Sequence, residues 1–157
     1  MVLYFYFFRL TSGSCVMNIR PFCVDDTDVV VALWQACELT RPWNNPHLDI
    51  LRKLDIQSSL FVVGEQGSDI IATAMFGYDG HRGWVNYLAV LPSQQRRGYA
   101  RKLMEYGERE LLSRGCPKLN LQIRSDNVQA AAFYRSLGYA EDKVVSYGKR
   151  LLEDESF

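Results

Sequence analysis

The stretch from Val85 to Ala100 constrains the fold more than any other part of this 157-residue chain. It begins as an apolar, strand-like run, breaks at Pro92, passes through a polar loop and opens a helix after Gly98. Glycine lets the backbone pass close to a ligand, and the first free N–H groups of a helix point outward with the positive end of its dipole. This order therefore predicts an anion site, and a phosphate or pyrophosphate is the anion that suits it.

The composition fits one domain with one core, since 48% of the residues are hydrophobic and 23% are charged. Eighteen basic residues balance eighteen acidic ones, so no overall field favours nucleic acid or an anionic membrane. Anion binding must then come from local groups such as Arg96 and Arg97. We expect reduced thiols in a cytoplasmic protein, without a zinc site or a disulfide framework, because the cysteines are scattered. They are Cys15, Cys23, Cys37 and Cys116.

The first sixteen residues differ from the rest, because the run from Met1 to Leu10 is almost wholly apolar and aromatic. Arg9 follows this apolar run instead of preceding it, and no small-residue cleavage pattern appears, which argues against a signal peptide. The run is also shorter than the ~20 residues of a membrane helix. We expect an extension at residues 1–16, disordered or arising from an upstream start, a single domain at 17–149 and a tail at 150–157.

The spacing of apolar residues predicts a mixed α/β (α+β) domain. Strands are expected at 17–22, 59–64, 69–78, 84–91 and 118–124, with one or two more between 139 and 149. One helix follows Asp26, and its expected inner face is Val29, Val30, Leu33, Trp34 and Cys37. A second begins at Pro46 and carries Leu48, Leu51, Leu54 and Ile56. Two more are expected from Gly98 to Gly115 and over 127–136.

Two blocks of sequence carry a family resemblance. Residues 95–100, Gln-Arg-Arg-Gly-Tyr-Ala, fit the pattern [QR]-x-x-G-x-[GA] between a strand and a helix. Residues 127–139 fit N-x-x-A-x-x-x-Y-x-x-x-G-[FY] after the next expected strand. With both blocks in this order, the chain resembles the GCN5-related N-acetyltransferase (GNAT) family over about residues 17–149. The resemblance implies a mixed, mainly antiparallel twisted sheet of about six or seven strands, flanked by about four helices.

The resemblance also implies that acetyl-CoA is the cosubstrate. In the family, its pyrophosphate sits on the backbone N–H groups of the loop and helix start, where the dipole adds about 0.3 to 1 kcal/mol of anion preference. The matching positions here are Gln95, Arg96, Arg97, Gly98, Tyr99 and Ala100. The pantetheine arm pairs with the preceding strand, which implies main-chain contacts at Leu88, Ala89 and Val90. Asn127 matches the family's asparagine that hydrogen-bonds the arm, and its place at a helix start equally suits an N-cap.

Tyr134 is the catalytic acid that the resemblance implies. A phenol with a pKa of about 10 stays protonated at neutral pH and can give its proton to the departing CoA thiolate. The structural alternative is a helix tyrosine that packs on the core beside Phe133.

The sequence leaves the general base open. Deprotonating a lysine-like amine at pH 7 costs about 4.6 kcal/mol, against about 1 kcal/mol for an α-amine. The family branch that acetylates ribosomal-protein N-termini has a glutamate five residues before the asparagine, but this chain has Gln122, which cannot take a proton. Asp79, Glu38, His81, or a water chain ending on backbone carbonyls, are the remaining candidates.

In the family that the chain resembles, the segment joining the first two helices walls the acceptor pocket, which implies residues 41–45 as one wall. The turn at 77–83 is the second candidate wall. Trp43 in the first segment either packs on a ligand or covers the core. We expect direct acetyl transfer to a primary amine of a small molecule or peptide. No metal, nucleic-acid or membrane partner is expected, and the chain would be a monomer or homodimer. The alternatives are an acyl-CoA sensor without turnover and a protein N-acetyltransferase.

Overall fold

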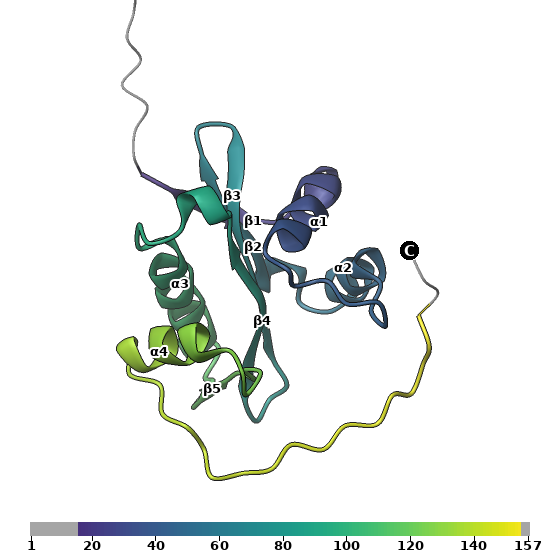
Figure 1. Ribbon diagram of the computed structural model, residues 1–157, viewed down its shortest axis with the longest axis vertical. Helices are drawn as coiled ribbons and strands as arrows, with labels where there is room; N and C mark the ends of the chain where they lie inside the picture. The colour runs from purple at the N-terminus through teal and green to yellow at the C-terminus, as the bar shows by residue number, and fades with distance from the viewer. Residues whose placement is uncertain (1–15, 155–157) are drawn as a thin grey trace, which may run out of the picture.

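A five-stranded sheet forms the centre of the computed structural model, which describes residues 16–154 (Figure 1). The strands lie side by side in chain order, as β1 (Asn18–Pro21), β2 (Phe61–Gln66), β3 (Asp69–Tyr78), β4 (Gly83–Val90) and β5 (Leu119–Asn120). The first four pair antiparallel, whereas β4 and β5 pair parallel. A parallel pair needs a crossover connection, and helix α3 (Tyr99–Ser113) supplies it. Apart from Val16, the expected N-terminal extension lies outside the described residues.

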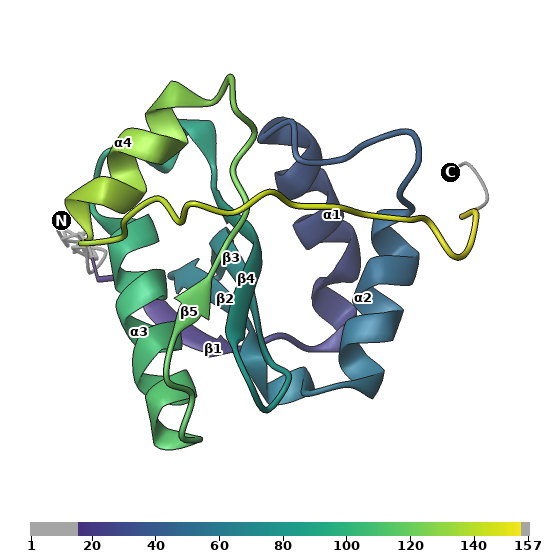
Figure 2. The same cartoon turned by 90° about the horizontal axis from the view of Figure 1, so that it is seen from below.

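Four α-helices cover the two faces of the sheet, in agreement with the predicted number. Helices α1 (Thr27–Ala36) and α2 (Pro46–Asp55) lie on one face, while α3 and α4 (Val128–Ser136) lie together on the other (Figures 1 and 2). Short 3₁₀ turns precede α1, β2 and the loop after β4, at Val24–Asp26, Ser58–Leu60 and Pro92–Gln94. None of the described helices is both long and apolar enough to cross a bilayer.

The alternation of side chains along the strands divides the core between the two helical layers. In β2, Phe61 and Val63 pack with α1, whereas Val62 packs with α3. This is the period of two that a strand with both faces covered requires. Gly107 lets α3 approach the sheet closely, because a Cβ at this position would overlap the ring of Phe76.

The predicted inner faces of the first two helices are partly wrong. Val29, Leu51 and Ile56 are 50%, 57% and 66% exposed. Val31 and Ile50 are buried in their layer instead. Only Pro46 and Ile50 of α2 are buried, and Ile56 lies beyond the helix as its C-cap.

The sheet has five strands, not the six or seven that were expected. β5 spans two residues instead of seven, and the described part of the chain forms no strand between 139 and 149. Beyond Asn120 the chain turns away from β4, so no ladder remains for a later strand to extend. We call residues 139–154 the C-terminal segment. It crosses from the end of α4 to α2 (Figure 2).

Side chains attach the C-terminal segment where a strand ladder was expected. Lys118 forms an ion pair with Asp142 at 2.5 Å, and Gln122 donates a hydrogen bond to Ser146 at 2.7 Å. The apolar side chains of the segment are not covered, since Val144, Val145 and Tyr147 are more than three-quarters exposed. The segment is therefore attached at points instead of packed along its length.

Candidate active site

A bulge interrupts β4 at Tyr87 and Leu88. Thr73 of β3 pairs with Ala89 and Met75 pairs with Asn86, so two residues of β4 lie opposite one residue of β3. Tyr87 has a φ of 50°, in the left-handed region that non-glycine residues seldom adopt. Among the described residues, the pairing of β4 with β5 stops at Trp84, before the bulge. The backbone around Leu88, Ala89 and Val90 therefore faces no β5 partner, as the predicted pantetheine contacts require.

A buried polar contact holds the bulge in place. The fully buried Thr73 hydroxyl accepts a hydrogen bond from Trp34 Nε1 at 2.9 Å and donates to the carbonyl oxygen of Tyr87 at 3.0 Å. The Trp34 ring also stacks on the Tyr87 ring, with centroids 3.9 Å apart. Two independent contacts thus fix the strained residue, which is how unusual backbone conformations persist.

The loop after β4 leads into an open helix start. Gly98 has a φ of 83° and is the N-cap of α3, where no side chain caps the helix. A Cβ here would meet nothing within 4 Å, so glycine is needed for its conformation and not for space. The first N–H groups of α3 are consequently available to a ligand. Gln95 ties the loop to β4 by donating to the carbonyl oxygen of Val90 at 3.0 Å, while Arg96 and Arg97 are exposed.

Helix α4 lies beside α3 and presents the second predicted block. The Oδ1 atom of Asn127 accepts from the N–H of Ala130 at 3.0 Å, so Asn127 caps this helix. At the other end, Arg101 of α3 donates to the carbonyl oxygen of Ser136 at 3.4 Å. The two sequence blocks thus border one side of the sheet.

Tyr134 sits in an aromatic cluster with its hydroxyl uncommitted. Its ring meets those of Phe133 and Tyr139 edge-on, at centroid distances of 5.1 and 5.7 Å. Within the described chain, its hydroxyl has no hydrogen-bond partner. Burial raises the pKa of Tyr134 to about 12. The phenol therefore stays protonated at neutral pH and has a proton to donate, and its ring also packs beside Phe133 as the structural alternative predicts.

Asp79, a candidate for the general base, and Gln122, at the position of the glutamate in one family branch, are both engaged elsewhere. The Asp79 carboxylate accepts the N–H groups of His81 and Arg82, each at 2.7 Å. These hydrogen bonds lower the pKa of Asp79, so this carboxylate closes a turn and is a weak base. Gln122 is directed to Ser146 of the C-terminal segment. In the part of the chain that the structure describes, no three His, Cys, Asp or Glu side chains cluster to hold a metal ion.

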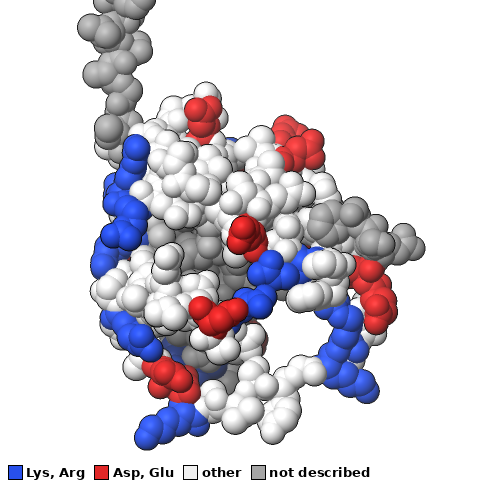
Figure 3. Space-filling view, in the orientation of Figure 1, with Lys and Arg blue, Asp and Glu red and all other residues white. Residues whose placement is uncertain are grey.

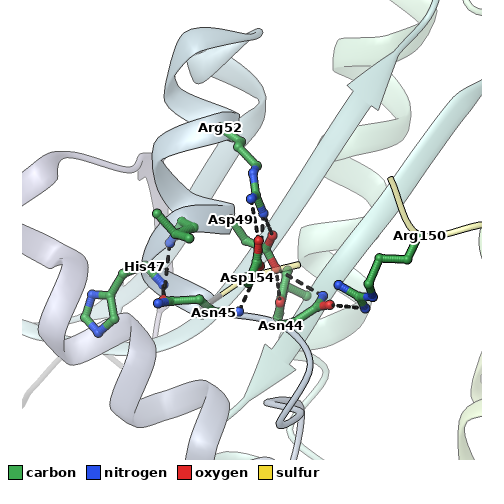
Figure 4. A network of polar contacts seen from close by, with 9 residues as sticks. Asn44, Asn45, His47, Asp49, Arg52, Arg150 and Asp154 are labelled. Atoms are coloured by element: carbon green, nitrogen blue, oxygen red, sulfur yellow. Dashed lines mark hydrogen bonds and ion pairs between the residues drawn. The ribbon is translucent and has the colours of Figure 1, made fainter. Parts of the chain in front are cut away.

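On the α1/α2 side of the bulge lies a network of polar side chains that the sequence did not reveal (Figure 4). The Tyr87 hydroxyl donates to Asp49 Oδ2 at 2.7 Å, and burial together with this carboxylate raises the pKa of Tyr87. Asn44 donates to the same oxygen at 3.3 Å, and Arg52 donates to Asp49 Oδ1 at 3.1 Å. Asp49 thus joins the bulge to α2 and to the loop before it.

The network continues into the C-terminal segment. Arg52 binds both oxygens of Asp154, at 2.5 and 3.1 Å, and the backbone N–H of Asn45 donates to the same carboxylate at 3.1 Å. These contacts hold the pKa of Asp154 at about 2. Arg150 donates to Asn44 Oδ1 at 3.0 Å. The predicted acceptor wall at 41–45 therefore meets a segment more than 100 residues later.

Trp43 lies in this wall with 55% of its surface exposed. Trp43 is not among the buried residues of either core cluster. The side chain is available to pack on a ligand.

The sequence profile of the Acetyltransferase (GNAT) family matches residues 29–139. The chain belongs to this family. GNAT enzymes use acetyl-CoA as cosubstrate, the one expected from the sequence, and the uncapped start of α3 with its open space at Gly98 fits such a group. The family assignment and the mixed α+β fold are thus confirmed.

Solved structures agree with this fold. Ard1 from Thermoplasma volcanium superposes with a TM-score of 0.72 at 22% identity, over 79% of this chain and 82% of that one. The ribosomal-protein-S18-alanine N-acetyltransferase from Escherichia coli gives 0.68 at 24% identity, over 82% and 80%. AAC(6')-Iy in complex with the bisubstrate analogue CoA-S-monomethyl-acetylneamine gives 0.70 at 20% identity, over 86% and 99%. At these identities the similarity is one of fold.

Proposed function

We propose that this GNAT domain is an N-acetyltransferase that transfers an acetyl group from acetyl-CoA directly to a primary amine. The observation that supports it most is the conjunction of the β4 bulge with the uncapped helix start at Gly98. The first leaves strand backbone free for an extended arm, and the second offers N–H groups to a pyrophosphate. Arg96 and Arg97 add positive charge next to that position.

In this proposal the protein catalyses mainly by positioning. The backbone of Leu88, Ala89 and Val90 holds the arm, so that the thioester lies beside the bulge. The amine nitrogen forms a bond to the acetyl carbon as the carbon–sulfur bond breaks. Tyr134 gives its phenolic proton to the departing sulfur, the proton lost by the amine passes to solvent, and the Tyr134 phenolate regains a proton from solvent.

An assay of thiol release with acetyl-CoA and a panel of amines tests the proposal. We expect acceptor-dependent release of CoA. Acetyl-CoA binding without release for any acceptor would contradict an enzyme and favour a sensor. Absence of binding would contradict the cosubstrate itself. Mass spectrometry of the acceptor establishes that nitrogen carries the new acetyl group.

A further inference from the structure

An open cavity of about 540 Å³ lies between α2 and the C-terminal segment. Asn44 and Arg52 line one side, and residues 148–152 with Asp154 line the other. We call this space the α2 pocket. In Figure 3, Lys and Arg side chains border the gap between this segment and the rest of the molecule.

The α2 pocket carries an excess of positive charge. Three of its lining side chains are cationic, Arg52, Lys149 and Arg150, against the single carboxylate of Asp154. Arg52 already neutralises Asp154 through two hydrogen bonds. Arg150 contacts the neutral amide of Asn44, and Lys149 has no polar partner among the described side chains. Arg150 also lies within the electrostatic reach of Asp154, so this one carboxylate faces two arginines, and the lining keeps a positive excess to which Lys149 adds.

The α2 pocket is connected to the bulge by direct hydrogen bonds. Asn44 accepts from Arg150 with its oxygen and donates to Asp49 with its nitrogen, and Asp49 accepts from Tyr87 of the bulge. The pocket is thus linked to the strand on which the thioester is proposed to lie. Asn44 and Arg52 place the pocket at α2. Helix α2 lies on the opposite face of the sheet from α3, whose start is proposed for the pyrophosphate (Figure 1).

We propose that the α2 pocket binds an anionic group of the acceptor through Lys149 and Arg150. The acceptor would be an amine that also carries a carboxylate or a phosphate, with the cations at one end and the reacting nitrogen at the other. The inference rests on the proposed acetyl transfer for its biological meaning, but the anion site itself can be tested by binding alone.

The binding test uses matched pairs of amines. Common amino acids are titrated against their amides, and phosphoethanolamine against ethanolamine, while NMR follows the arginine Nε–H signals. We expect the anionic member of at least one pair to shift the Arg150 signal and its neutral counterpart to leave it unchanged. Selective binding of amino acids indicates a carboxylate, and selective binding of phosphoethanolamine a phosphate. Equal shifts within all pairs, or no shift with any anion, would overturn the proposal.

Two charge-removing variants locate the site. Arg150→Gln keeps a donor for Asn44, and Lys149→Gln breaks no polar contact of the described chain. Each should weaken binding of the anionic amine by about fivefold, the size of one exposed charge interaction. Arg114→Gln removes an equal charge from an exposed ion pair with Glu110 and should not change the affinity. Equal weakening in all three, with circular dichroism unchanged, would overturn the assignment.

Turnover distinguishes this inference from the proposed function. Selective anion binding without CoA release for any amine supports the pocket and contradicts the enzyme. CoA release at equal efficiency with acids and amides supports the enzyme and contradicts the pocket. If both hold, Arg150→Gln raises the KM for the anionic amine and leaves the KM for acetyl-CoA unchanged.

Discussion

The two sides of the bulge are built from different parts of the polypeptide. On the cofactor side, the proposed main-chain contacts of β4 and of the start of α3 follow each other within sixteen residues of chain, 85–100, and the side chains of Asn127 and Tyr134 come from the next helix, α4. On the acceptor side, a side-chain network joins groups 102 to 109 residues apart in sequence. A main-chain site depends on glycine and on the order of the elements, so it can be recognised in a single sequence. A side-chain site exists only after the fold has brought distant residues together.

The largest effect is expected from Tyr134→Phe, which asks whether the cofactor side supplies chemistry as well as binding. Removing the phenolic proton should lower kcat by about a hundredfold, with little change in the KM for acetyl-CoA. Because burial raises the pKa of Tyr134 to about 12, the phenol is protonated throughout the assay range. The loss should therefore be the same at each pH between about 6 and 10. Steady-state values of kcat, measured for both proteins at each pH, test this expectation.

Tyr139→Phe is the matched control for this variant. It removes a hydroxyl from the same aromatic cluster, one that donates to Glu108 at 2.7 Å. We expect kcat to stay near that of the unaltered protein. Full turnover in Tyr134→Phe would remove this tyrosine as the acid and restrict the cofactor side to binding.

A smaller effect is expected from Gly98→Ala. Alanine at a φ of 83° is strained by about 1 kcal/mol or more, so the loop shifts and the KM for acetyl-CoA should rise by about tenfold. Gly67→Ala carries similar strain, at a φ of 65° in the turn between β2 and β3, and it also has open space around it. The KM for acetyl-CoA should be unchanged in Gly67→Ala. An equal rise in both variants would mean that strain alone, and not the cradle, determines the affinity.

Thr73→Val tests the boundary between the two sides. Valine preserves the shape but leaves Trp34 Nε1–H without its acceptor and the Tyr87 carbonyl without its donor, at a cost of about 1–3 kcal/mol. Urea unfolding measures the loss of stability. Because the bulge contacts both sides, the KM values of acetyl-CoA and acceptor should rise together.

Thr27→Val removes an exposed hydroxyl, which donates to the carbonyl oxygen of Val24, and is the control for the boundary variant. It should change the free energy of unfolding much less and neither KM. If Thr73→Val raised only one KM, the bulge would serve that side alone.

The predictions from sequence succeeded where local backbone chemistry determines the structure, and they failed where contacts between distant residues determine it. The strand, loop and helix around Gly98 were predicted because local backbone chemistry determines them. Nothing local marks Tyr87 as a left-handed residue, since the cause is a contact with Thr73 and Trp34 elsewhere in the fold. One or two final strands were predicted between 139 and 149, but a strand also needs a neighbouring ladder, and β5 ends too early to provide one.

Asp154 was likewise assigned to a tail, because its role depends on Arg52 and on the N–H of Asn45. On this side the sequence offered the segment at 41–45, which the family resemblance implied as a pocket wall. Its partners could not be found without the fold, because the chain offers several arginines and carboxylates of equal local character.

The smallest effect is expected from Asp154→Asn. This variant loosens the acceptor side and leaves the cofactor side unchanged. Without the carboxylate, Arg52 loses its strongest partner, and trypsin should cut after Lys149 and Arg150 about threefold faster, as the open form becomes more populated. Glu110→Gln removes an equal charge from the exposed pair with Arg114, away from the C-terminal segment, and should not accelerate these cuts. The KM for acetyl-CoA should be the same in both variants.

The pH dependence of this attachment has a definite sign. The pKa of Asp154 falls from its ordinary 3.8 to about 2 on folding, so the attachment is complete above the higher value and is lost as the pH falls through the lower one. The protection of residues 148–154 against amide exchange, relative to the intrinsic rate at each pH, should therefore fall over this interval in the unaltered protein and stay constant in Asp154→Asn. Protection that fell equally in both would show that another carboxylate anchors the segment. In that case the acceptor side would not depend on the contact with α2, and its contrast with the cofactor side would rest on Asp49 and Tyr87 alone.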